Sequence, residues 1–124
     1  DLPITFLGKL APTELKGVLS RSQIFVQPST KESFGIAALE ARTGGLAVIA
    51  RKGTGTQTFI TDGIDGRMCE SDEAMVAAIA AWDRDRDSLR RVLKHNSEVA
   101  PKYSWSDIDQ VVRASYQRAI ALAQ

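Results

Sequence analysis

Two glutamates, Glu32 and Glu40, frame a stretch of small residues that could bind an anion. They lie in the segment 28–45, between two apolar runs at 24–26 and 47–50. This order predicts a strand, a loop, a helix and a second strand. The first amides of such a helix have no partner within it and point out of its N-terminal end. The segment therefore predicts a site for an anion, above all a phosphate.

The expected start of the helix determines which groups face this site. We expect Ser33 to be the N-cap, because its hydroxyl can accept a hydrogen bond from a first-turn amide. Gly35 has no side chain to block a ligand, and Ala37 has a small one. Glu40 lies roughly 7–8 Å along the helix axis from Gly35 and leans back toward the N-terminus. Carboxylates repel phosphate and accept hydrogen bonds from hydroxyls. The pattern therefore predicts that a diphosphate binds to the amides and that sugars lie on either side of it.

The spacing alone is equally compatible with a plainer interpretation of the same residues. In it, the N-terminus of the helix holds only water. Glu32 then complements the helix dipole, and Glu40 is a solvated residue on the helix surface.

Hydrophobic patterning predicts the elements that position this segment. Strands are expected at 3–7, 24–27, 47–50 and 67–69. Six helices are expected: one that begins at Pro12, one after Ser33, one over about 56–61, one that begins after Ser71, one that contains Leu89 and ends before Pro101, and one that begins at Ser104. Ser104 also begins a Ser-x-x-Asp box with Asp107. The predicted fold is α/β, a Rossmann-like three-layer sandwich of about four parallel strands with helices on both faces, in one domain over residues 1–124.

Composition argues against several classes of function. Lys and Arg number 16 and Asp and Glu 15, so no field of one sign favours nucleic acid as a partner. The single cysteine, Cys69, is expected to be a small buried hydrophobe, because no His lies near it in the sequence. The single histidine, His95, has no triad or metal-ligand partner beside it in the sequence, so it is not expected to be a catalytic base. Trp82 is expected in the core. The sequence has no apolar run of about 18 residues and no signal-peptide pattern.

Several motifs together are similar to those of one enzyme family. Two glutamates separated by seven residues, with Phe34-Gly35 after the first, resemble the signature of retaining glycosyltransferases of family four, which have the GT-B fold. Further similarities follow in family order: Phe6-Leu7-Gly8, Gln27-Pro28-Ser29, Glu40-Ala41 through Ala50, Asp62-Gly63 with Gly66, and Trp105 before a helix containing Tyr116. The resemblance covers nearly the whole chain.

The resemblance implies a C-terminal donor-binding domain that takes a nucleotide-diphosphate sugar, with UDP or GDP as the carrier, for transfer to an alcohol. It implies that Glu32 is catalytic and accepts from hydroxyls of the donor sugar, and that Glu40 binds the ribose. The backbone around Lys9 and Leu10 would meet the base. The implied contacts with the donor sugar and diphosphate come from Glu32, Ser33, Phe34, Gly35, Ile36 and Ala37. The resemblance also implies metal-independent chemistry with no cofactor.

The chain also departs from the family pattern. The usual Gly-Gly-x-x-Glu loop ends in Thr58, which puts any contact made by that loop in doubt. Two strand–helix units with a basic pair, and the acceptor domain, are not found in these residues. We therefore expect an N-terminally truncated piece, inactive alone and cytoplasmic, with the inner face of a membrane as the alternative for the full-length protein.

Two expectations concern partners and alternatives. Residues 3–7 should either pair directly with 24–27 or exchange within a homodimer formed through the exposed truncation surface. The functional alternatives are a non-catalytic module that binds a nucleotide or nucleotide sugar, and a phosphate-binding α/β domain used only for assembly.

Overall fold

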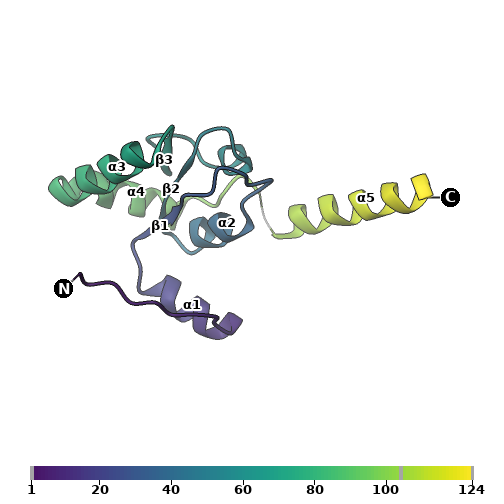
Figure 1. Cartoon of the computed structure of the whole chain (residues 1–124), viewed down its shortest axis with the longest axis horizontal. Helices are drawn as coiled ribbons and strands as arrows, with labels where there is room; N and C mark the ends of the chain where they lie inside the picture. Colours follow the sequence, from purple (N-terminus) through teal and green to yellow (C-terminus); the bar gives the residue numbers. More distant parts are fainter. Residues whose placement is uncertain (1, 104, 124) are drawn as a thin grey trace.

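The computed structural model describes residues 2–103 and 105–123 (Figure 1). Its elements are α1 (Pro12–Ser20), β1 (Ile24–Gln27), α2 (Ile36–Thr43), β2 (Ala47–Arg51), the 3-10 helix η1 (Gly55–Thr58), β3 (Gly66–Cys69), α3 (Asp72–Arg84), α4 (Arg86–Glu98) and α5 (Trp105–Ala123). Ser71 caps α3 as predicted, with its hydroxyl oxygen 3.1 Å from the Ala74 nitrogen. The predicted box from Ser104 lies outside the described residues.

The sheet is parallel and has the order β1-β2-β3. In its register, Phe25 lies opposite Val48 and Ala50 lies opposite Met68. The first four residues of β2 are fully buried, as expected for a central strand covered on both faces. The predicted α/β sandwich class is therefore confirmed.

Alternate residues of β2 face opposite sides of the sheet. Val48 and Ala50 pack against α2, whereas Ala47 and Ile49 pack against α3 and α4. Helix residues buried on these two sides are Ala38, Leu39 and Ala41 on one, and Met75, Ala78, Trp82, Leu89 and Val92 on the other. Trp82 and Cys69 lie in the core, as predicted.

The predicted strand at residues 3–7 is wrong. This segment is exposed and has no strand partner among the described residues, and Phe6 is 94% exposed. β1 pairs only with β2, so direct pairing between 3–7 and 24–27 is wrong too, and the described sheet has three strands rather than about four. An apolar run becomes a strand only where a neighbouring backbone accepts its hydrogen bonds. The exchanged homodimer stays a prediction.

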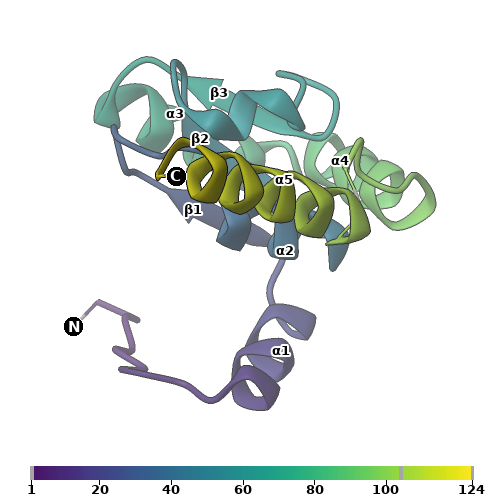
Figure 2. The same cartoon turned by 90° about the vertical axis from the view of Figure 1, so that its right-hand side faces the viewer.

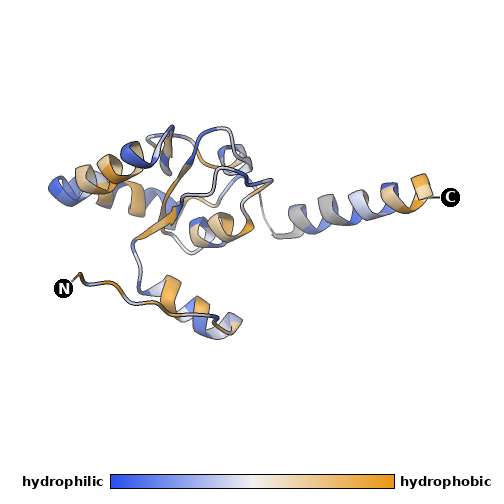
Figure 3. Ribbon diagram, in the orientation of Figure 1, coloured by the Kyte–Doolittle hydropathy of each residue, from blue (hydrophilic) through white to orange (hydrophobic). Residues whose placement is uncertain are grey.

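Two helices lie apart from the packed body. Figures 1 and 2 show α1 beside the body on the α2 side, and α5 extending away from it. Figure 3 shows apolar stretches on the N-terminal segment and at the end of α5. No helix in the described ranges is long and apolar enough to cross a bilayer.

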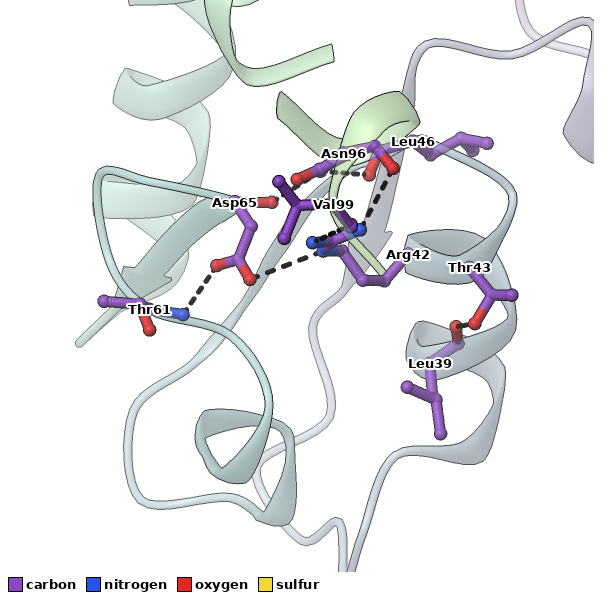
Figure 4. Close-up of polar contacts among 8 residues, drawn as sticks. All are labelled: Leu39, Arg42, Thr43, Leu46, Thr61, Asp65, Asn96 and Val99. Atoms are coloured by element: carbon purple, nitrogen blue, oxygen red, sulfur yellow. Dashed lines mark hydrogen bonds and ion pairs between the residues drawn. The ribbon is translucent and has the colours of Figure 1, made fainter. Parts of the chain in front are cut away.

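A buried polar network fixes α2 against the body (Figure 4). The Arg42 guanidinium pairs with Asp65, with Nε 3.3 Å from Oδ2, and donates to the carbonyl oxygens of Asn96 at 3.2 Å and Val99 at 2.9 Å. The Asn96 amide donates to the carbonyl oxygens of Leu46 at 2.8 Å and Asp65 at 2.9 Å. These bonds join the end of α2, the turn before β3 and the end of α4.

Candidate functional site

The loop between β1 and α2 is closed by a hydrogen bond between its own residues. The Gly35 amide donates to Glu32 Oε1 at 3.2 Å, and Gly35 is the N-cap, with a φ of 89°. A positive φ suits glycine, because it has no Cβ to clash. The prediction that Ser33 caps the helix is therefore wrong: the helix begins two residues after Phe34, at Ile36.

The first turn of α2 offers backbone donors at the carboxyl end of β1. The first bond of the helix runs from the Leu39 amide to the Gly35 carbonyl, at 2.9 Å. Within the described residues, the amides of Ile36, Ala37 and Ala38 have no acceptor. Ile36, the first residue of α2, is 47% exposed. Three adjacent amides at the positive end of a helix dipole can bind an anion.

A second loop, after β2, packs directly onto the first. The Gly55 amide donates to the Glu32 carbonyl at 2.8 Å. A Cβ atom on Gly55 would lie 2.0 Å from the Ser33 carbonyl oxygen, so only glycine fits. Since both loops follow the carboxyl ends of adjacent parallel strands, they meet at one edge of the sheet. The second loop thus forms a wall beside the start of α2.

Besides Arg51 Nε, at the end of β2, two buried polar side-chain atoms at this edge have no hydrogen-bond partner among the described residues. They are Thr56 Oγ1, on η1, and Gln27 Oε1, at the end of β1. Thr56 is fully buried, and a Cβ on Gly35 would lie 2.5 Å from its Oγ1. The hydroxyl therefore lies against the backbone where α2 begins. An unpaired buried polar group costs about 1–3 kcal/mol, so a ligand that hydrogen-bonds to it would gain that much in return.

The aromatic ring of Phe34 holds the tip of the first loop. It contacts the ring of Phe59, with centroids 5.5 Å apart, and the ring of Tyr103, 5.9 Å apart and edge-on. These contacts come from the segment after η1 and from the segment before α5. The backbone of Phe34 is thus available at the site, whereas its side chain packs against Phe59 and Tyr103.

Glu40 lies in a groove that runs along α2 toward its C-terminal end. The groove has a volume of about 530 Å³ and separates α1 from α2; its lining residues are Pro12, Leu15, Lys16, Leu19, Ser20, Glu40, Thr43 and Gly44. Lys9 and Leu10 immediately precede the N-terminal end of α1, and Lys9 is exposed. The structure thus brings Glu32, the first-turn amides and Thr56 together. It places Glu40 on the same helix but facing α1.

Sequence reasoning did not name Thr56 as a site residue. A usable signal was present: a glycine between two threonines, directly after a buried strand, at the same sheet edge as the first loop. Across residues 2–103 and 105–123, no three His, Cys, Asp or Glu side chains are grouped to hold a metal ion. Metal independence itself stays a prediction.

Residues 3–99 match the family model described as "Glycosyl transferases group 1". Among curated proteins, D-inositol 3-phosphate glycosyltransferase from Nocardia farcinica is 32% identical over 119 residues. The alignment covers 94% of this chain and 26% of that protein. The chain thus spans about a quarter of the length of this curated relative.

Solved structures share the fold. Sucrose-phosphate synthase from Thermosynechococcus elongatus superposes with a TM-score of 0.73 at 26% identity, over 95% of this chain and 30% of that one. HepE from Anabaena, in a complex with UDP and glucose, superposes with a TM-score of 0.62 at 19% identity, over 86% of this chain and 28% of that one. The second likeness concerns the fold alone.

Proposed function

Because the chain belongs to the glycosyl transferases group 1 family, we propose that it is the donor-binding part of a retaining glycosyltransferase. The parent enzyme moves a sugar from a nucleotide-diphosphate sugar to an alcohol acceptor. One observation carries the proposal: free amides at the start of α2 lie beside the unpartnered, buried hydroxyl of Thr56. The glycosyltransferase name of the relative from Nocardia and the complex of HepE with UDP and glucose support it.

In this proposal the backbone binds the diphosphate. The amides of Ile36 and Ala37 donate to phosphate oxygens at the positive end of α2, and the buried Thr56 hydroxyl joins them when the two loops move apart around the ligand. As the bond from the sugar to the diphosphate breaks, negative charge develops on the departing phosphate. Donors fixed in place stabilise that charge without reorganising, which lowers the barrier.

The two glutamates bind hydroxyl groups in this proposal. Glu32 Oε1 accepts from the Gly35 amide in the structure, which leaves its other oxygen to accept from a hydroxyl of the donor sugar. Glu40 accepts from the ribose in the groove between α1 and α2, and the backbone of Lys9 and Leu10 meets the base at the end of that groove.

A non-catalytic nucleotide-binding module is the second candidate, and Thr58 is the observation that favours it. Thr58 stands where the family pattern expects a Glu, and it is exposed at the end of η1. A module of this kind would bind the nucleotide sugar and transfer nothing. A longer chain with the acceptor domain, assayed for sugar transfer, distinguishes the two.

The partner of the apolar N-terminal segment and of α5 is proposed to be the acceptor-binding part of the same protein. Phe6 is 94% exposed, and Leu122, near the end of α5, is 88% exposed. Exposed apolar residues in such numbers commonly mark an interface. A second copy of this chain is the alternative occupant. Light scattering on the 124-residue chain distinguishes the two, because a concentration-dependent doubling of mass would favour the homodimer.

A ligand-observed NMR screen of the chain tests the donor site. UDP, GDP and ADP, with their glucose or mannose conjugates, are titrated into the wild type, Glu40→Ala and Thr56→Val. The matched control is Glu73→Ala, which removes an exposed glutamate from α3. We expect selective binding of one diphosphate, at least about tenfold weaker in both site variants, since a hydrogen bond involving a charged group contributes about 1.5–3 kcal/mol. Equal binding by all four proteins would contradict the assigned donor site.

A further inference from the structure

A second cavity lies at the opposite edge of the sheet from the donor site. Its volume is about 330 Å³, and its lining residues are Gly63, Ile64, Arg67, Trp82, Ser88, Arg91, Val92 and His95. Gly63 and Ile64 lie in the turn before β3, and Arg67 is the second residue of that strand. Because the strands are parallel, the amino end of β3 and the carboxyl ends of β1 and β2 are at opposite edges. This cavity therefore shares nothing with the donor site.

Positively charged and neutral side chains that can donate hydrogen bonds line this cavity on two sides. Ser88, Arg91 and His95 are spaced i, i+3 and i+7 on α4, which places them on one stripe of the helix. Arg67 comes from β3 on the other side. Two guanidinium groups, an imidazole and a hydroxyl can together donate several hydrogen bonds to one anion.

Arg91 is not paired with any of the described charged residues around the cavity, so its guanidinium can bind a ligand. The neighbouring arginines of α4 are paired with carboxylates: Arg86 Nη2 is 2.6 Å from Asp83 Oδ1, and Arg90 Nη1 is 2.7 Å from Asp87 Oδ1. Within the described residues, the Arg91 side chain has neither an ion pair nor a hydrogen bond.

The second arginine of the cavity has one partner. Arg67 Nε is 3.2 Å from Asp62 Oδ1, in a pair whose side chains are about half exposed. Exposed pairs are weak, about 0–1 kcal/mol, and the other nitrogens of the Arg67 guanidinium stay free to donate. The negatively charged carboxylate of Asp62 would repel an anion bound in the cavity.

The remaining wall of the cavity is apolar. Trp82 and Val92 are buried, and Ile64 is 52% exposed at the rim. A cavity of about 300 Å³ is at the small end of the range for organic ligands. We propose that it binds a small phosphomonoester, with the phosphate on Arg67, Arg91 and His95 and the organic group against Ile64 and Val92.

The single histidine makes this proposal directly testable. The ring signals of His95 are unique in the NMR spectrum, so they report on the cavity without further assignment. The 124-residue chain is titrated with inorganic phosphate and with phenyl phosphate, at constant ionic strength and a pH of about 7.5, where a phosphomonoester is mostly a dianion. The variants are Arg91→Gln and Arg67→Gln, and the matched control is Arg90→Gln, on the same helix but outside the cavity.

We expect the His95 signals to shift to saturation, with phenyl phosphate binding severalfold tighter than inorganic phosphate because of the apolar wall. Arg91→Gln and Arg67→Gln should each weaken binding at least about tenfold, as for a lost charge-assisted hydrogen bond, and Arg90→Gln should leave it unchanged. Glu40→Ala should also leave it unchanged, whatever happens at the donor site. A linear, non-saturating shift, or an equal response in Arg90→Gln and Arg91→Gln, would overturn the proposal.

Discussion

The guanidinium of Arg42 and the carboxylate of Asp65 form an ion pair in the protein interior, with Nε 3.3 Å from Oδ2 and the Arg42 side chain 1% exposed. The two residues are 23 positions apart, so the pair fixes the end of α2 to the turn that precedes β3. Arg42 also donates hydrogen bonds to the carbonyl oxygens of Asn96 and Val99. Charge inside a protein is tolerated only when it is paired in this way.

Replacing Arg42 by Met should destabilise the protein strongly. The substitution keeps the aliphatic stem but leaves the Asp65 carboxylate buried without its cation, which costs about 3–5 kcal/mol. Urea unfolding, followed by far-ultraviolet circular dichroism, measures the loss. Arg86→Met is the control, because its pair with Asp83 is exposed and is worth about 0–1 kcal/mol. Similar losses in the two variants would show that the buried network does not fix α2.

Replacing Gly55 by Ala should separate the two loops of the candidate site. The added methyl would lie 2.0 Å from the Ser33 carbonyl oxygen, a backbone atom that can move only with its loop. We expect a loss of about 1–3 kcal/mol in unfolding free energy, as for overpacking, together with weaker nucleotide binding.

Gly17→Ala is the matched control for this change. In α1 the same methyl would meet only the tip of the Arg21 side chain, at 3.6 Å. Alanine in a helix interior is better than glycine by about 0.8–1 kcal/mol, so this variant should gain stability. Equal effects of the two substitutions would mean that the contact between the loops is looser than described.

Replacing Thr56 by Val should change stability and ligand binding in opposite directions. The buried hydroxyl has no partner among the described residues, so its removal should raise the unfolding free energy by up to about 1–3 kcal/mol. The same variant should bind a nucleotide diphosphate more weakly, because a donor at the start of α2 is lost. Thermal unfolding with and without UDP measures both effects. A variant that is both less stable and unaffected in binding would contradict the assigned role of Thr56.

Cys69 should make the protein less stable at alkaline pH. Burial raises the pKa of the Cys69 thiol, although the nearby Arg67 acts in the opposite direction. The unfolded thiol ionises near pH 8.5, before the folded one. The unfolding free energy should therefore fall as pH rises above about 8.5, with a slope of at most about 1.4 kcal/mol per pH unit from this group.

Denaturant titrations under reducing conditions, at pH values from about 7 to about 10, test this expectation. Other groups titrate over the same range, so Cys69→Ala serves as the reference. The stability difference between wild type and variant should shrink as the pH rises. A constant difference would show that the folded and unfolded thiols ionise together.

Much of the sheet could be predicted from local pattern. Ile24–Gln27 and Ala47–Arg51 begin with apolar runs, and the structure has strands at both, although only β2 is largely buried. The Pro3–Leu7 run has the same local character, yet it forms no strand. A strand depends on a hydrogen-bonded neighbour, and no local pattern reveals whether one is present.

The candidate site divides in a similar way. The spacing of Glu32 and Glu40 pointed to the start of α2, and the structure has a helix there with free amides. It could not show that the Glu32 carboxylate accepts a hydrogen bond from the Gly35 amide, because the helix begins at Ile36 and not directly after Ser33, as the sequence predicted. Nor could it show that Thr56, 21 positions from Gly35, lies against that residue, because this proximity comes from the parallel pairing of β1 with β2.

The strand order β1-β2-β3 follows the order of the chain, and this has a consequence for how the protein folds. Each strand pairs with the next one in sequence, so no pairing has to wait for a distant segment to arrive. The loop-closure entropy is therefore smaller than for a sheet whose neighbouring strands are far apart in the chain, although parallel strands still form more slowly than helices or hairpins. The sheet with α2 can thus assemble as one early kinetic unit, while the exposed N-terminal segment and α5 contribute little to the folding rate.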